Sequence, residues 1–227
     1  MIISHKNRFI FIKTEKTAGT SIEIALSKYC GPEDVITPIT PEDEAKRKSL
    51  GYRGAQNYKI PFAKYSKIDF CKAVQQRSRL AFFNHAGASF IKRYLDKDIW
   101  DSYYKFCFER NPWDKVVSWY YWRYKKEPRP PISDFVQSTE ANIIKGFELY
   151  TISSEIVVDK VFLFENLSQA MEEISAKLGL DEIPSLPKAK SGFRKDKRSY
   201  REILSEKDRE KIQKVYAREI AYFNYEW

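Results

Sequence analysis

The alternation of apolar and polar segments along this chain predicts strands that are each followed by a helix. Residues 8–13 (RFIFIK) form a short apolar run typical of a buried strand, and a polar loop leads from it into an amphipathic helix marked by Ile22 and Leu26. Residues 103–109 (YYKFCFE) predict a second strand, and Pro112 suits the first turn of the helix that follows. The same unit, a strand that feeds a helix through a short polar turn, therefore occurs twice.

The rest of the chain continues this alternation. Further strands are expected at 80–85 and 156–167, and further helices at 68–77, 88–95, 133–138, 168–178 and 205–223. Strands that alternate with helices indicate a parallel sheet with crossover connections. We therefore expect one domain over residues 1–227: a three-layer, P-loop-like α/β fold with a central parallel sheet flanked by helices.

Composition narrows the class of protein but does not choose a partner. The 227 residues are 43% hydrophobic and 31% charged, which fits a globular domain, and Lys and Arg exceed Asp and Glu to give a formal charge of +9. Such an excess attracts nucleotides, acidic glycans, nucleic acid and anionic membranes, but it also simply keeps a protein soluble.

The cysteines and histidines argue against a metal protein. Cys30, Cys71 and Cys107 lie far apart without a CxxC pair, and the two histidines, His5 and His85, are too few for a multi-His metal site. No segment has the length of a signal-peptide core or a membrane span. We expect no metal, no stable membrane insertion, and a cytoplasmic protein with reduced cysteines.

The loop after the strand predicted at residues 8–13 has features of an anion-binding site. A basic side chain precedes a helix start whose backbone amides can hold a phosphate. The residues concerned are Lys16, Thr17, Ala18, Gly19, Thr20 and Ser21. The loop is not a Walker A motif, which needs Gly where Thr14 stands and Lys where Thr20 stands. An ordinary helix start with Thr20 or Ser21 as N-cap explains the loop equally well when it is taken alone.

The second strand-to-helix corner carries Arg110-Asn111-Pro112-Trp113-Asp114, with Ser118 further along the helix. A guanidinium at this place can hold a phosphate with two parallel hydrogen bonds, and the hydroxyl of Ser118 can add a third. The alternative is a structural ion pair between Arg110 and Asp114 beside a helix started by proline.

The two motifs KTAGTS and RNPWDKVVSWY, in this order and on these elements, resemble the PAPS-dependent sulfotransferases, whose donor is 3'-phosphoadenosine-5'-phosphosulfate (PAPS). FNHAG, VFLFENL and the terminal NYEW extend the resemblance to carbohydrate sulfotransferases of the heparan and chondroitin type and their bacterial relatives over nearly the whole chain. The resemblance implies that the loop Lys16–Ser21 binds the 5'-phosphosulfate side and that Arg110 and Ser118 bind the 3'-phosphate. It also implies a carbohydrate as the hydroxyl acceptor, and Lys16 as the group that stabilises the leaving phosphate.

Three further residues enter as site candidates. His85 has an ordinary pKa near neutrality and suits the general base that deprotonates the acceptor hydroxyl, and the family places a histidine in this region. Glu23, in the first helix, is the substitute base. Arg198, in the basic stretch with Arg194, Lys195 and Lys197, can close over the 3'-phosphate, although a solvated run of charge explains that stretch as well.

Some questions stay open. Residues 32–65 and 125–150 are expected to shape the acceptor pocket. The aromatic residues of the helix after Pro112 either stack on a sugar or bury one face in the core; they are Trp119, Tyr120, Tyr121, Trp122 and Tyr124. The alternatives to a sulfotransferase are a nucleotide kinase, which the missing Walker residues disfavour, and a nonenzymatic basic module for nucleic acid or acidic glycan. The sequence does not specify the oligomeric state.

Overall fold

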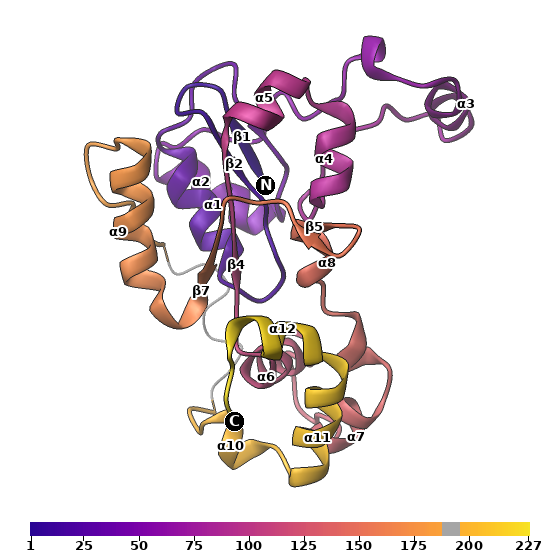
Figure 1. Ribbon diagram of the computed structural model, residues 1–227, viewed down its shortest axis with the longest axis vertical. Coiled ribbons are helices and arrows are strands. Elements are labelled where there is room, and N and C mark those ends of the chain that lie inside the picture. The colour runs from indigo at the N-terminus through magenta and orange to yellow at the C-terminus, as the bar shows by residue number, and fades with distance from the viewer. Residues whose placement is uncertain (188–195) are drawn as a thin grey trace.

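The computed structural model describes residues 1–187 and 196–227, and its centre is a five-stranded sheet (Figure 1). The strand order is β3-β1-β2-β4-β7. The bounds are β1 (Ile2–Ser4), β2 (Phe9–Phe11), β3 (Val35–Ile36), β4 (Tyr104–Glu109) and β7 (Lys160–Leu163). A separate two-stranded ribbon pairs β5 (Thr151–Ile152) with β6 (Glu155–Ile156).

The sheet is mixed, so the expectation of a parallel sheet is wrong at one edge. β2, β4 and β7 run parallel, whereas β1 is antiparallel to both of its neighbours, β2 and β3. The reason is the short connection at residues 5–8, since a few residues can join antiparallel strands but a parallel pair needs a long crossover. Residues 2–4 form a strand that the sequence pattern did not predict.

Helices fill most of the remaining described chain. The α-helices before the middle strand are α1 (Gly19–Ser27), α2 (Pro41–Ser49), α3 (Lys67–Gln75), α4 (Ala88–Tyr94) and α5 (Lys97–Ser102). Those after it are α6 (Pro112–Arg123), α7 (Ile132–Gln137), α8 (Phe147–Tyr150), α9 (Leu167–Leu178), α10 (Tyr200–Ile203), α11 (Glu206–Val215) and α12 (Ala217–Phe223). Short 3-10 turns are η1 (Phe62–Lys64), η2 (Glu140–Ile143) and η3 (Phe164–Asn166).

Helices pack against both faces of the sheet because successive strand residues point to opposite sides. Phe9 and Phe11 lie in one apolar cluster with residues of α1 and α9. Ile10 and Ile12 lie in another cluster with residues of α4, α5 and α8. The chain is thus an α/β protein whose sheet is covered on both faces (Figure 1).

A third apolar cluster lies beyond the end of β4 at which α6 begins (Figure 1). There Val116 and Val117 of α6 pack with Phe135 of α7 and Ile212 of α11. The helix expected over 205–223 is two helices, because the backbone of Tyr216 leaves helical geometry at φ −107° and ψ 28°.

Residues 80–85 do not form a strand of the sheet. Ala81 makes one isolated bridge to Lys59, and Phe82 N–H donates to Tyr58 O at 2.7 Å. The apolar run therefore pairs with an irregular segment rather than with the sheet. Within the described ranges, no helix has both the length and the apolar character to cross a bilayer.

Candidate functional site

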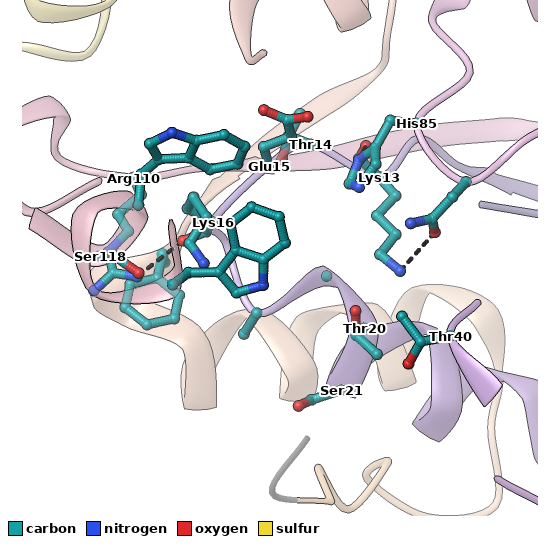
Figure 2. Close-up of a pocket in the computed structure, with 16 residues that line it drawn as sticks. Lys13, Thr14, Glu15, Lys16, Thr20, Ser21, Thr40, His85, Arg110 and Ser118 are labelled. Carbon is teal, nitrogen blue, oxygen red and sulfur yellow. Dashed lines mark hydrogen bonds between the residues drawn. The ribbon is translucent and has the colours of Figure 1, made fainter. Parts of the chain in front are cut away.

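A cavity of about 560 Å³ opens where the parallel strands β2, β4 and β7 end (Figure 2). The three corners that follow these strands supply Lys16, Arg110 and Phe164 respectively. The full lining is Lys13, Thr14, Glu15, Lys16, Ala18, Gly19, Thr20, Ser21, Thr40, Asn84, His85, Arg110, Ser118, Trp119, Trp122 and Phe164. Ligands of α/β proteins commonly bind at this edge of the sheet.

The loop between β2 and α1 is shaped to present its backbone. Lys16 and Ala18 both have positive φ, at 63° and 57°. Thr14 anchors the loop, because its hydroxyl donates to the carbonyl of Phe108 and lies 2.9 Å from the hydroxyl of Thr17. Alternating left-handed residues of this kind turn successive N–H groups toward one side, which is the geometry of an anion-binding loop.

The start of α1 has no side-chain cap. Ala18 occupies the N-cap position, so the alternative that Thr20 or Ser21 caps the helix is wrong. Gly19, Thr20 and Ser21, the first residues of the helix, line the cavity. The positive end of the helix dipole therefore meets the cavity.

Gly19 is needed for packing rather than for an unusual backbone. A Cβ atom added there would stand 2.7 Å from Cγ of Lys13, whose chain passes directly over the glycine. Lys13 is nearly fully buried, so it has little room to move away. The absence of a side chain at position 19 thus lets the aliphatic chain of Lys13 pack directly against the start of α1.

Arg110 joins the two corners. Its Nη1 donates to the carbonyl of Lys16 at 2.8 Å, while Nε and Nη2 both donate to Asp114 Oδ2 at 2.9 and 2.6 Å. The guanidinium also stacks 4.1 Å from the ring centre of Phe164. The structural ion pair with Asp114 is therefore present, and Arg110 also lines the cavity.

Helix α6 presents two kinds of surface. Ser118, Trp119 and Trp122 line the cavity, whereas Tyr120 and Tyr121 are buried in the helical cluster. The aromatic residues of this helix thus divide between the site and the core. The ammonium of Lys16 lies 5.2 Å from the ring centre of Trp122 and 6.0 Å from that of Trp119, within reach of a cation–π interaction.

His85 lines the cavity opposite Arg110 and Ser118 (Figure 2). Its Nδ1 lies 2.8 Å from the carbonyl of Lys13, and because a carbonyl only accepts, Nδ1 carries the proton. Burial, and then the charge of Lys13, lowers the pKa of His85 to about 4. At neutral pH the imidazole is therefore uncharged, with an unprotonated Nε2.

Glu23 is not placed to act as a base. Its carboxylate is fully buried and lies 2.8 Å from Lys13 Nζ, 3.3 Å from Arg47 Nη2 and 3.3 Å from the amino group of Met1. Although burial pushes the pKa of Glu23 up, these cations hold it at about 2. Its role is to neutralise Lys13, which also donates to Asn84 Oδ1 at 2.7 Å.

Two of the expected binding residues do not line the cavity. Thr17 is buried and its hydroxyl anchors the loop from behind. Arg198 lies outside the lining and pairs with Asp196, which also accepts from the hydroxyl of Tyr121 at 3.1 Å. Arg194 and Lys195, of the same basic stretch, lie outside the described residues.

Some lining residues escaped the sequence interpretation. Glu15 is held by the amide of Lys145 at 2.8 Å, and burial raises its pKa. Phe164 could have been found, because it follows a predicted strand and the ends of parallel strands meet at one edge. Thr40 and Asn84 also line the cavity, but neither belongs to a sequence motif that would mark it as a site residue. In the described ranges, no group of three or more His, Cys, Asp or Glu side chains has the arrangement of a metal site.

Comparison with known proteins identifies a relative but not an activity. No protein-family model matches the chain. A protein of Archaeoglobus fulgidus described as an uncharacterized protein is 36% identical over 97 residues, which are 40% of this chain and 81% of the relative.

Proposed function

We propose that this chain, which belongs to one family with the Archaeoglobus fulgidus protein, is a PAPS-dependent sulfotransferase with a P-loop-like fold. One observation carries the proposal. The two motifs that resemble those of sulfotransferases line a single cavity, where Arg110 Nη1 lies 2.8 Å from the carbonyl of Lys16. One nucleotide can therefore reach both corners.

The lining fits a nucleotide with phosphates at both ends. A volume of about 560 Å³ falls in the range of ligand pockets. Lys16 and Arg110 contribute positive charge, Arg110 as part of its pair with Asp114, whereas Glu23 neutralises Lys13. Glu15 is the acidic residue among the described lining. Indole and phenyl rings in the same wall offer flat surfaces on which a base or a sugar can stack.

When bound, PAPS supplies a sulfuryl group, which leaves the 5'-phosphate oxygen as a new bond forms to the acceptor oxygen. The residues of this chain bind and orient the two reactants. Lys16 and the amides at the start of α1 favour negative charge at the 5' side, and such preorganised donors act most strongly where charge develops. Arg110 and Ser118 hold the 3'-phosphate.

His85 takes the proton of the acceptor hydroxyl. Its Nε2 is unprotonated, since Nδ1 donates to the carbonyl of Lys13. We propose a carbohydrate as the acceptor and the cytoplasm as the place of action. The pKa of about 4 replaces the near-neutral value expected from the sequence and makes His85 a weaker base. A general base contributes about 10²- to 10⁴-fold to the rate when its pKa is near the working pH, so we expect a loss near the lower end, about 10²-fold, in His85→Gln.

Calorimetry with 3'-phosphoadenosine-5'-phosphate against ATP with Mg²⁺ tests the proposal. We expect the bisphosphate to bind and ATP to bind at least tenfold more weakly, because the Arg110–Ser118 corner serves a 3'-phosphate that ATP lacks. Lys16→Met should weaken the bisphosphate about tenfold or more, whereas Lys207→Met, on exposed α11, should not change it. Tight ATP binding with Mg²⁺ and none of the bisphosphate would indicate a kinase instead.

Transfer itself is measured with PAPS carrying a labelled sulfuryl group and a panel of glycans, lipids and small alcohols. We expect label to appear on a glycan hydroxyl with the native protein, and much less with His85→Gln. A protein that binds the bisphosphate but transfers label to none of these acceptors contradicts the enzymatic assignment.

A further inference from the structure

An arm built from residues 58–82 extends from the body of the protein and carries α3 at its tip (Figure 1). Its base is a short ribbon in which Phe82 N–H donates to Tyr58 O at 2.7 Å and Ile60 N–H donates to Leu80 O at 2.9 Å. Neither the cavity nor its lining involves the arm. Its surface therefore needs a separate explanation.

The outer surface of the arm is apolar. Val74 is 77% exposed and Ile68 is 65% exposed, and both belong to α3. Phe70 is also exposed, and its ring stacks on that of exposed Phe62, with the ring centres 5.9 Å apart. Large apolar side chains gathered on one short helix and the adjacent turn mark an interaction surface more often than isolated ones do.

The arm is also basic. Residues 59–79 contain six Lys or Arg and a single acidic residue, Asp69. The basic residues are Lys59, Lys64, Lys67, Lys72, Arg77 and Arg79. All six are exposed; Lys64 pairs with Asp96 of the neighbouring loop, and Arg79 stacks on Phe62. The exposed apolar side chains of the arm thus occur among exposed basic residues.

Polar contacts on the inner side of α3 fix the arm to the body of the protein. Asp69 faces inward, where it accepts from Tyr94 OH at 3.0 Å and pairs with Arg93 at 3.1 Å, which fixes α3 to α4. Ser66 and Asp69 close a capping box at the start of the helix. Since these inner contacts fix α3, its most exposed apolar side chains, Ile68 and Val74, can be changed without loss of the fold.

We propose that this arm docks on the surface of an anionic lipid bilayer. Exposed apolar side chains on a basic helix are the combination that lies in a lipid headgroup region, with the apolar groups inserted and the cations against acidic headgroups. The positive charge selects this partner over a second copy of the chain, because two such arms would repel each other. The inference is independent of the sulfotransferase proposal.

Sedimentation with lipid vesicles tests it. We expect the full-length protein to pellet with vesicles of phosphatidylcholine containing about a third phosphatidylserine, and to stay in the supernatant with phosphatidylcholine alone. Binding should fall as salt rises, because part of the attraction is electrostatic. Equal recovery with both vesicle types, or no pelleting with either, overturns the proposal.

Two double variants separate the contributions. Ile68→Ser with Val74→Ser removes apolar surface, and Lys67→Glu with Lys72→Glu reverses charge; each is expected to weaken binding roughly tenfold or more. The matched control, Lys207→Glu with Lys214→Glu on α11, makes the same change of net charge away from the arm and should bind several-fold more tightly than the Lys67/Lys72 variant. Equal loss in both charge variants would mean that net charge, not the arm, attracts the vesicle.

A fluorophore on Cys71 gives a direct readout. Cys71 is the exposed cysteine of α3, while Cys30 and Cys107 are buried. An environment-sensitive dye there should shift to the blue with anionic vesicles. If it does not shift, and light scattering instead finds a dimer that Val74→Ser dissolves, the arm is a contact between copies of the chain and the proposal is wrong.

Discussion

At the scale of single residues, the cavity depends on the way Lys13 is placed. Its carbonyl fixes the tautomer of His85, its ammonium is neutralised by Glu23, and its aliphatic chain crosses over Gly19. Burial, and after it the charge of Lys13, keeps the imidazole neutral at pH values where a free histidine is largely protonated. Lys13 therefore sets the chemistry of the site without being part of either sequence motif.

The pKa of His85 can be measured directly, because the chain has only two histidines. We expect one imidazole signal in a proton NMR titration to have a midpoint near pH 4, since burial and the charge of Lys13 oppose protonation. The spectrum of His85→Gln identifies that signal by its loss. A midpoint near 6.5 for His85 would contradict the geometry described for its ring.

Gly19→Ala tests the close passage of Lys13. The new Cβ would stand 2.7 Å from Cγ of Lys13, so the side chain or the helix start must shift. We expect the free energy of unfolding to fall by about 1–3 kcal/mol, the usual cost of forcing atoms into a packed site. Gly54→Ala is the control, because there the nearest atom is 3.8 Å away, on Glu44. Equal stability of the two variants would show that the passage is not tight.

At the scale of elements, the two strand–loop–helix units were predictable and their surroundings were not. β2 with α1 and β4 with α6 have apolar runs, a polar turn and helical spacing in the right order. β1 is three residues long, too short to show a pattern of alternating apolar and polar residues. Its position in the sheet follows from its antiparallel pairing with β2, which the sequence pattern did not predict. Residues 80–85 are apolar enough for a strand, but an apolar run does not say which partner it pairs with.

Arg110 also supports the loop before α1, and hydrogen exchange tests this link between two elements. Arg110→Lys keeps the charge but cannot donate to both Asp114 and the carbonyl of Lys16 from one fork. We expect the amides of residues 15–21 to exchange several-fold faster in the variant, while those of β4 stay protected. Unchanged exchange in this loop would mean that Thr14 and Thr17 hold it without help from Arg110.

At the scale of the whole molecule, acid should destabilise the fold in two overlapping pH windows. The pKa of His85 is lowered from 6.5 to about 4, so the unfolded chain binds more protons in that range and stability falls as pH drops through it. The pKa of Glu23 is lowered from 4.5 to about 2, so its contribution is present above pH 4.5 and is lost as pH falls toward 2. Both effects have the same sign.

Urea unfolding between pH 7 and 4 measures the first window. For one proton the slope reaches about 1.4 kcal/mol per pH unit. We expect His85→Gln to lose roughly half of the decline between pH 6.5 and 5.5, where Glu23 stays largely ionised in both states. The other half comes from the buried amino group of Met1, whose pKa is lowered from 8.0 to about 5 by burial. Parallel pH curves for the native protein and the variant would rule out His85 as the source.

The part of the candidate site that the sequence predicted correctly consists of residues near the ends of predicted strands. Lys16, Ser118, Arg110 and His85, chosen from the sequence, all line one cavity. Arg198 does not, because its guanidinium pairs with Asp196, a local contact that a run of charges does not reveal. The burial of Glu23 among three cations was equally hidden, since Arg47 lies far from it in sequence.

A crystal structure with bound 3'-phosphoadenosine-5'-phosphate tests the central claim most directly. The account predicts one nucleotide in the cavity, with its 5'-phosphate at the amides that begin α1 and its 3'-phosphate within hydrogen-bond distance of Arg110 and Ser118. A nucleotide that touches only one of these two corners, or that binds elsewhere on the protein, would contradict it.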